Sequence, residues 1–210
     1  MNKLVKIVED LKKSSMKKVV DKKMEEFEEL GKKSSKDLFK ELCFCLLTAN
    51  FSAQGGIKIQ NEIQDGFGNL TEEELAKKLS ELGHRFPNAR AKFIFEARKY
   101  KDNIKEILIA FETENEMRDW LVKNIKGIGF KESSHFLRNI GYKNIAIIDF
   151  HIVDLLVKND LIEPLKNKSL TPKKYLEVEK ILKKISEKTN TNLGELDLYL
   201  WYEETGKILK

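Results

Sequence analysis

A lysine and an aspartate in the middle of the chain combine a possible nucleophile with a carboxylate. Lys131 lies two residues after a Gly-Ile-Gly turn, and Asp149 directly follows the apolar stretch IAII. An amine can attack an electrophilic carbon, and a nearby carboxylate can stabilise the positive charge that develops and help to move a proton. If the fold brings these two groups together, they form a nucleophilic site.

The elements around Lys131 predict that it lies beside a phosphate-binding turn. Apolar residues at helical spacing indicate a helix that ends before Gly127. Gly127 and Gly129 permit backbone angles that other residues avoid, so the chain can reverse tightly. The amides of the turn and of the next helix are then left to face an anion. Such amides bind phosphate and fix the position of a protein on DNA without reading its sequence.

The segment after this second helix can bring Asp149 back to Lys131. The helix, predicted at 131–139, rises about 1.5 Å per residue and so runs roughly 14 Å away from the turn. Extended residues span up to about 3.3 Å each, so residues 142–148 are long enough to return. Each feature has an ordinary alternative: a packing turn, a solvated lysine, and a helix N-cap aspartate. Together they predict the excision of a base from DNA.

The same segment resembles the helix-hairpin-helix superfamily of DNA glycosylases, in the branch that carries a lysine. The wider resemblance, to the small archaeal-type 8-oxoguanine DNA glycosylases, rests on LCFCLLTANFSAQGG, LGHRFPNARAKFI, GIGFKESSHFLRN, IAIID and DLYLWY. These stretches are spread over most of the chain. The resemblance implies a bifunctional enzyme that excises 8-oxoguanine through a Schiff base on Lys131, assisted by Asp149, and then cleaves the strand as an abasic-site lyase.

The resemblance also implies where the damaged base binds. Phe86 and Trp201 would sandwich the extruded base, and Lys210 would offer its terminal carboxylate to the guanine edge. A carboxylate only accepts hydrogen bonds, which suits the N1 and N2 donors of a guanine-type base. From the residues alone, Trp201 and Phe86 are also readable as ordinary core aromatics.

Further residues are expected to contact the DNA. Asn50 aligns with the superfamily position that fills the space left by the extruded base, although asparagine is also a common helix terminator. His84 and Arg85 are predicted to contact the DNA backbone or to wedge into it, with a solvated arginine as the alternative. The resemblance implies that Gly127 and Gly129 meet the DNA backbone. It also implies that carbonyl groups of the hairpin can hold a monovalent cation.

Composition permits nucleic-acid binding without requiring it. The 210 residues carry a formal net charge of +5, and 35% of them are charged. No apolar run approaches the roughly 20 residues of a membrane span, and the charged N-terminus does not resemble a secretory signal. We expect an intracellular protein of the cytoplasm or nucleoid that acts as a monomer on double-stranded DNA containing 8-oxoguanine.

Cysteine content limits the cofactors that the chain could hold. Cys43 and Cys45 are its only cysteines and lie in an apolar helical run. Side chains two positions apart on a helix point in different directions, so we expect neither a disulfide nor a metal site. The iron–sulfur cluster of endonuclease III-like relatives needs four cysteines and is excluded. No cofactor is expected to be required.

Helical periodicity and capping signals dominate the chain and predict an all-α fold. Ser34 with Asp37 and Thr71 with Glu74 resemble capping boxes, and Thr171 precedes a proline suited to the first helical position. Only residues 145–148 indicate extended structure, too short and solitary for a sheet. The helices are predicted near residues 3–30, 36–49, 54–64, 72–82, 88–100, 115–125, 131–139, 150–158, 173–188 and 193–204.

By the resemblance, residues 1–210 form a single glycosylase unit with two helical lobes and an active cleft between them. The terminal segments, about 1–35 and 150–210, would make one lobe, and the middle helices, about 36–149, the other. This division comes from the family, because periodicity cannot reveal a lobe assembled from both ends of the chain.

Other functions stay open at this point. A non-catalytic helix-hairpin-helix DNA-binding module would need the glycine turn but neither Lys131 nor Asp149. A lysine-dependent glycosylase or lyase for other lesions, such as oxidised pyrimidines, would use the same pair on a different base. A helical protein-interaction domain would leave both the turn and the lysine unexplained.

Overall fold

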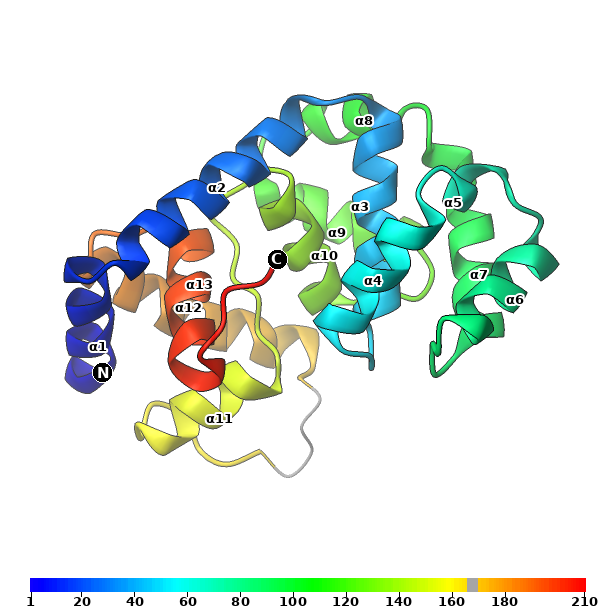
Figure 1. The fold of residues 1–210 in the computed structure, drawn as a ribbon. Helices are drawn as coiled ribbons and strands as arrows, with labels where there is room; N and C mark the ends of the chain where they lie inside the picture. Colours follow the sequence, from blue (N-terminus) through cyan, green and yellow to red (C-terminus); the bar gives the residue numbers. More distant parts are fainter. Residues whose placement is uncertain (166–169) are drawn as a thin grey trace.

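Helices joined by short connections make up the part of the chain that the computed structural model describes, residues 1–165 and 170–210 (Figure 1). No strand occurs in these ranges, and the predicted all-α fold is confirmed. The elements are α1 (Asn2–Lys13), α2 (Met16–Lys32), α3 (Ser35–Thr48), α4 (Ala53–Ile63), α5 (Gly66–Asn69), α6 (Glu72–Glu81), α7 (Pro87–Ala97), the 3-10 helix η1 (Arg98–Tyr100), α8 (Ile104–Ile109), α9 (Glu114–Asn124), α10 (Phe130–Asn139), α11 (Phe150–Lys158), α12 (Pro172–Lys188) and α13 (Leu193–Thr205). No helix of the described residues is long and apolar enough to cross a membrane.

The structure differs from the predicted helices in a few places. The single helix predicted at 3–30 is two helices, because the Ser14 hydroxyl donates to the Leu11 carbonyl at 2.7 Å and accepts from the Met16 amide at 3.1 Å. A serine that bonds backbone on both sides ends one helix and begins the next. The short elements α5 and α8 were not predicted, because four to six residues carry too little periodicity to be recognised, and the helix predicted at 88–100 is α7 followed by the 3-10 turn η1.

The predicted caps form with one difference. Thr71 and Glu74 make a reciprocal capping box at the start of α6, and Thr171 caps α12 with proline at its first position. Ser34 accepts from the Asp37 amide, but the Asp37 carboxylate accepts from the Ser34 hydroxyl at 2.6 Å instead of from the N-cap amide. The shorter aspartate side chain therefore completes only half of a capping box.

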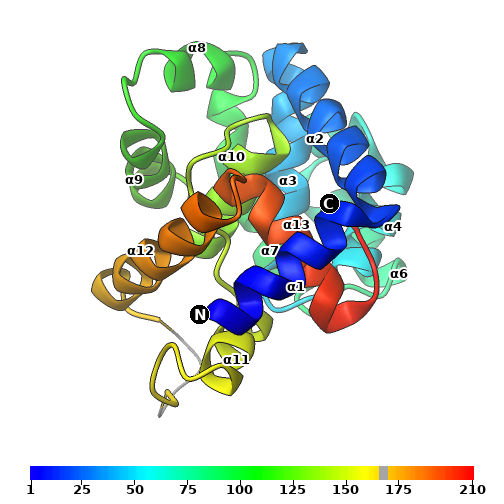
Figure 2. The same ribbon diagram turned by 90° about the vertical axis from the view of Figure 1, so that its left-hand side faces the viewer.

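Apolar side chains form two separate cores. One core uses residues from 38–145, and the other uses residues from 4–27 and 146–200, so Ile145 and Ala146 are neighbours in sequence that pack into different cores. In Figure 1, α1, α11, α12 and α13 group apart from α3 to α9, and Figure 2 views the molecule from the side of α1 and α11. The two-lobed architecture is confirmed. The predicted bounds of the lobes remain an interpretation, because α10 packs against both α2 and α3.

A buried ion pair ties the lobes together. Arg118 of α9 is 1% exposed and donates to both oxygens of Glu179 in α12, at 2.7 and 2.9 Å. Oε1 of Glu179 also accepts from the Ala146 amide at 2.8 Å. The guanidinium lies over the rings of Phe130 and Tyr175, with centroid distances of 5.0 and 5.6 Å. The two terminal nitrogens of the guanidinium are therefore paired with the carboxylate, as a buried charge requires, whereas its Nε has no hydrogen-bond partner among the described residues.

Helix α12 also holds the extended segment that ends at Asp149. The Tyr175 hydroxyl donates to the Ala146 carbonyl at 2.7 Å and accepts from the Ile148 amide at 3.1 Å. These bonds replace the strand partner that an extended segment would otherwise need. Burial raises the pKa of Tyr175 far above its ordinary value, so the phenol keeps the proton that it donates.

Replacing Glu179 by alanine should destabilise the fold by about 3–5 kcal/mol, because it leaves the Arg118 guanidinium buried without its anion. The matched change Glu26→Ala removes an exposed ion pair with Lys23 and should cost at most about 1 kcal/mol. Denaturant unfolding of both variants measures the difference. Equal losses would show that the buried pair does not hold the lobes together.

Candidate active site

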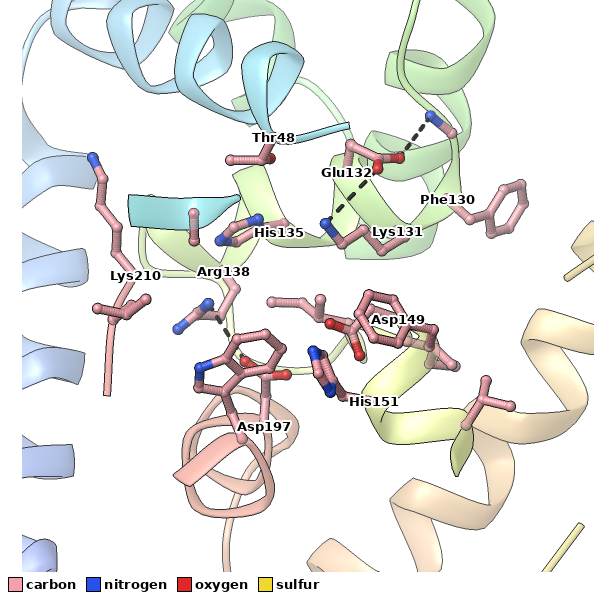
Figure 3. A pocket seen from close by; sticks show the side chains of 18 of the residues that line it. Thr48, Phe130, Lys131, Glu132, His135, Arg138, Asp149, His151, Asp197 and Lys210 are labelled. Atoms are coloured by element: carbon pink, nitrogen blue, oxygen red, sulfur yellow. Dashed lines mark hydrogen bonds and ion pairs between the residues drawn. The ribbon is translucent and has the colours of Figure 1, made fainter. Parts of the chain in front are cut away.

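A cavity of about 1120 Å³ opens between the two lobes. Its walls come from the end of α3 and the loop to α4, from the first turns of α10, from residues 147–151, and from α13 with the C-terminal segment. A volume of this size accommodates a nucleotide-sized ligand. Its lining contains several acidic and basic side chains, many of which Figure 3 shows.

Lys131 and Asp149 both line this cavity (Figure 3). Lys131 lies in the first turn of α10, where its side chain is 26% exposed and its Nζ is 3.8 Å from Oε1 of Glu132. Asp149 is the N-cap of α11, and its Oδ1 accepts from the Ile152 amide at 3.0 Å. Capping fixes the rotamer of Asp149 and leaves the carboxylate at the cavity wall, so the capping and catalytic interpretations are compatible.

The hairpin glycines have different tasks. Gly127 has φ +92°, and a Cβ added there would lie 2.2 Å from the ring of Phe93. Gly129 has φ −114° and ψ −163°, extended backbone that any residue adopts, and its amide donates to Oε2 of Glu132 at 3.3 Å. The prediction of unusual backbone angles at both glycines is therefore wrong for Gly129. Gly129 begins α10 at the cavity wall, whereas Gly127 makes the turn.

One face of α10 adds two cavity residues that the sequence reasoning missed. His135 and Arg138 follow Lys131 by four and seven positions, the spacing that places side chains on one helix face. His135 is 6% exposed, and within the described residues neither ring nitrogen makes a hydrogen bond of normal geometry. Burial, and then the nearby Arg138 and Lys131, hold the pKa of His135 well below its ordinary value. The imidazole is therefore neutral.

Asp197 of α13 faces Arg138 across the cavity floor, with 3.4 Å between Oδ2 and Nη2 (Figure 3). Burial raises the pKa of Asp197 to about 6; the charge of Arg138 opposes this shift and that of Asp149 adds to it. A carboxyl group with such a pKa exchanges protons near neutral pH. Asp197 was not predicted, although its position one helical turn before Trp201 is a signal that could have found it.

The structure does not bring Phe86 and Trp201 together. Trp201 lines the cavity and packs edge-on against His151, with 4.9 Å between ring centroids. Phe86 precedes α7, is 39% exposed, and is absent from the cavity lining. Its ring instead lies 5.0 Å from the guanidinium carbon of Arg85, which is itself exposed. The predicted sandwich is therefore not formed in this conformation.

The position of His84 does not fit the predicted contact with the DNA backbone. It is 4% exposed, its Nε2 pairs with the Leu47 carbonyl at 3.0 Å, and its Nδ1 accepts from the Phe86 amide at 3.0 Å. Burial lowers the pKa of His84, so the ring is neutral. Both nitrogens are used inside the protein, and the side chain braces the loop that carries Arg85.

Asn50 and Lys210 both line the cavity. Asn50 is exposed and has φ +60°, a left-handed conformation that asparagine tolerates better than most residues. The side chain of Lys210 pairs with Glu41 in the opposite lobe at 2.8 Å. The structure therefore brings six of the ten predicted site residues to one cavity: Asn50, Gly129, Lys131, Asp149, Trp201 and Lys210.

Neither cysteine reaches the cavity. Cys43 and Cys45 are buried free thiols, and burial raises their pKa values well above the ordinary range. Among the residues that the structure describes, no cluster of three or more histidine, cysteine or acidic side chains could hold a metal ion.

Comparison with known families matches residues 20–191 to Ogg-HhH, the 8-oxoguanine DNA glycosylase family. The chain belongs to this family. Proteins named 8-oxoguanine DNA glycosylase/AP lyase from Korarchaeum cryptofilum and Methanocaldococcus jannaschii are 56% and 55% identical to it. Both alignments cover 99% of this chain, and they cover 98% and 99% of the respective relatives.

Solved structures agree with this membership. The M. jannaschii 8-oxoguanine glycosylase/lyase in complex with a DNA 15-mer containing 8-oxoguanine superposes with a TM-score of 0.95, at 54% identity over 99% of both chains. The 8-oxoguanine DNA glycosylase of Thermotoga maritima gives a TM-score of 0.93 at 45% identity, covering 100% of this chain and 99% of the other. The described residues of this chain thus share the helical fold of these family members.

Replacing Gly127 by alanine should destabilise the fold and weaken DNA binding. The new Cβ needs a left-handed backbone and displaces the Phe93 ring, at a cost of about 1–3 kcal/mol. Gly129→Ala is the matched control for stability, because a Cβ there meets only Oε2 of Glu132, at 3.8 Å. Thermal unfolding of both variants and DNA titration of Gly127→Ala test this, and equal thermal stability of the two variants would contradict the assigned difference.

Replacing Asp197 by asparagine should change how stability depends on pH. Because the folded-state pKa of about 6 lies above the ordinary 3.8, the fold favours the protonated acid. That contribution is present in full below about pH 4 and is lost as pH rises through 6. The unfolding free energy of the variant relative to wild type should therefore increase by about 2 kcal/mol from pH 4 to pH 7. Denaturant unfolding across this range measures it, and a constant difference would contradict the raised pKa.

Proposed function

We propose that this protein is a DNA repair enzyme that excises 8-oxoguanine from duplex DNA and cleaves the strand at the resulting abasic site. Its membership in the 8-oxoguanine DNA glycosylase family and its likeness to relatives named glycosylase/AP lyase support the proposal. The observation that carries the chemistry is the presence of Lys131 and Asp149 on one cavity. It acts as a monomer on chromosomal DNA and requires no cofactor.

Lys131 is the nucleophile in this proposal. Its uncharged Nζ attacks C1′ of the damaged nucleotide, and the bond from C1′ to the base breaks, with its electron pair and a proton passing to the leaving base. Opening of the sugar ring gives an imine between C1′ and Nζ. Loss of a proton from C2′ then expels the 3′ phosphate and cleaves the strand.

Neighbouring carboxylates assist these steps. Asp149 stabilises the positive charge that develops on the sugar. Glu132, 3.8 Å from the amine, holds Lys131 at the cavity wall before substrate binds. Asp197, with its pKa raised to about 6, accepts and returns protons in the same cavity.

The first turn of α10 and the hairpin bind the DNA backbone. Amides at a helix N-terminus attract phosphate, and Gly127 and Gly129 keep side chains away from it. Asn50, at the cavity rim, fills the space that the extruded base leaves. Arg85, exposed on its loop, contacts the backbone. A monovalent cation on the hairpin carbonyls remains a prediction.

The extruded base stacks on Trp201, and the terminal carboxylate of Lys210 accepts from the guanine edge. Phe86 completes the sandwich only if its loop moves toward the cavity when DNA binds, since it lies outside the cavity lining in this conformation. Ring stacking on a flipped base is worth about 1–3 kcal/mol, enough to drive a modest loop movement.

Borohydride trapping on a duplex with one 8-oxoguanine tests the proposal. Wild type should form a covalent adduct, and Lys131→Gln should form none, because the amine is lost. Asp149→Asn should slow excision by about 100-fold or more while DNA affinity stays within about threefold. Asparagine keeps the cap on α11, so this variant isolates the loss of charge.

Undamaged duplex and duplex with an oxidised pyrimidine are the comparison substrates. An adduct with the oxidised pyrimidine alone would support the lysine mechanism but show that the substrate is an oxidised pyrimidine. If the protein binds DNA but forms no adduct and releases no base from any duplex, it is a non-catalytic DNA-binding module. Full activity of Lys131→Gln would exclude Lys131 as the nucleophile.

A further inference from the structure

Lys210 follows α13, and its side chain occupies a polar site formed by α3 and α4 in the opposite lobe. Its Nζ donates to Oε2 of Glu41 at 2.8 Å and to Oε1 of Gln60, and it lies 4.3 Å from the ring centroid of Phe44. Glu41 is 2% exposed. Two carbonyl-type oxygens and an aromatic face are the surroundings that an ammonium group prefers.

Hydrogen bonds that do not involve Lys210 orient the groups of this ammonium site. Nδ2 of Asn139 donates to Oε1 of Glu41 at 2.6 Å, which leaves Oε2 for the lysine. Nε2 of Gln60 donates to Oε2 of Glu41 and to the Lys40 carbonyl, both at 3.1 Å, so its amide oxygen faces Nζ. Without the lysine, Glu41 would be a buried carboxylate that only neutral donors compensate.

The anchored side chain holds the chain end at the cavity. Figure 3 shows the ammonium of Lys210 pointing away from Lys131 and Asp149, while Lys210 itself remains part of the cavity wall. The main-chain carbonyl of Lys210 lies close to His135, where it partly offsets the lowered pKa of the imidazole. The main chain of Lys210 therefore lies against the face of α10 that carries Lys131 and His135.

The anchor also spans the two lobes. Lys210 follows α13, whose apolar side chains belong to one core, whereas Glu41 in α3 and Gln60 in α4 belong to helices of the other. Figure 1 shows the C-terminal segment leaving α13 and running toward α10. The last residue thus reaches across the cavity and is held on its far side.

We propose that Glu41, supported by Gln60, is a positioning residue for base recognition. By binding the ammonium of Lys210 it sets the place of the terminal carboxylate, so the last residue serves as an anchor through its side chain and as a reader through its main chain. This inference rests on the proposed function, in which that carboxylate accepts from the guanine edge.

The test compares two rates for each variant: single-turnover excision of 8-oxoguanine, and strand cleavage at a preformed abasic site that has no base to recognise. Glu41→Gln and Lys210→Met should each lower the ratio of excision to abasic cleavage by about tenfold or more, since each loses a charge-assisted hydrogen bond. Glu62→Gln, an exposed carboxylate on α4, is the matched control and should keep the wild-type ratio.

The double variant decides whether the two residues act together. Glu41→Gln combined with Lys210→Met should lower the ratio no further than the more affected single variant, because both remove one anchor. A wild-type ratio in Glu41→Gln, or effects that multiply in the double variant, would overturn the proposal. If Glu41→Gln fails to fold, Lys210→Met tests the anchor from its other partner, and a wild-type ratio there overturns it as well.

The wild-type protein shows whether the proposed function fails, independently of this inference. Wild-type protein that cleaves abasic DNA but leaves 8-oxoguanine in place would refute the substrate, whatever the Glu41 variants do. An added glycine after Lys210 moves the carboxylate and keeps the ammonium. If this extension leaves the ratio unchanged while Lys210→Met lowers it, the anchor exists but the carboxylate is not the reader, and the proposal fails.

Discussion

The carboxylate of Glu179 is the interaction on which the geometry of the cavity depends. It neutralises the buried Arg118 of α9 and accepts from the backbone of Ala146. A buried guanidinium without an anion costs several kcal/mol, so this arrangement is strongly enforced. Helix α9 leads into the hairpin and to Lys131, and Ala146 leads to Asp149. One carboxylate therefore holds both the helix that leads to Lys131 and the segment that leads to Asp149.

Directional polar contacts help to set the register of the lobes across the cavity. The two apolar cores are separate, and hydrophobic burial has no preferred direction. Three charged pairs cross between the lobes: Arg118 with Glu179, Arg138 with Asp197, and Lys210 with Glu41. Charge-assisted hydrogen bonds have defined geometry. They place the walls of the cavity relative to one another with the accuracy that a nucleophilic site requires.

Helix α10 brings binding and chemistry into one element. Its N-terminus follows the hairpin of Gly127 and Gly129, and its Lys131 face continues through His135 and Arg138 into the cavity. Burial lowers the pKa of His135 and raises that of Asp197 to about 6, so both groups are shifted away from their charged forms. In the proposed function, the position of this one helix therefore decides where the phosphate lies, where the amine attacks and which groups surround the base.

Sequence alone determined what depends on residues close together in the chain: the helices and their caps at Thr71 and Thr171, the turn at Gly127, and the return of the chain to Asp149. These follow from local hydrogen bonding, periodicity and reach. Tertiary structure decided which distant groups join them. It buried His84, left Phe86 outside the cavity, brought Asp197 to it, and paired Glu41 with Lys210. Burial and charge pairing arise between elements far apart in sequence, so no local pattern records them.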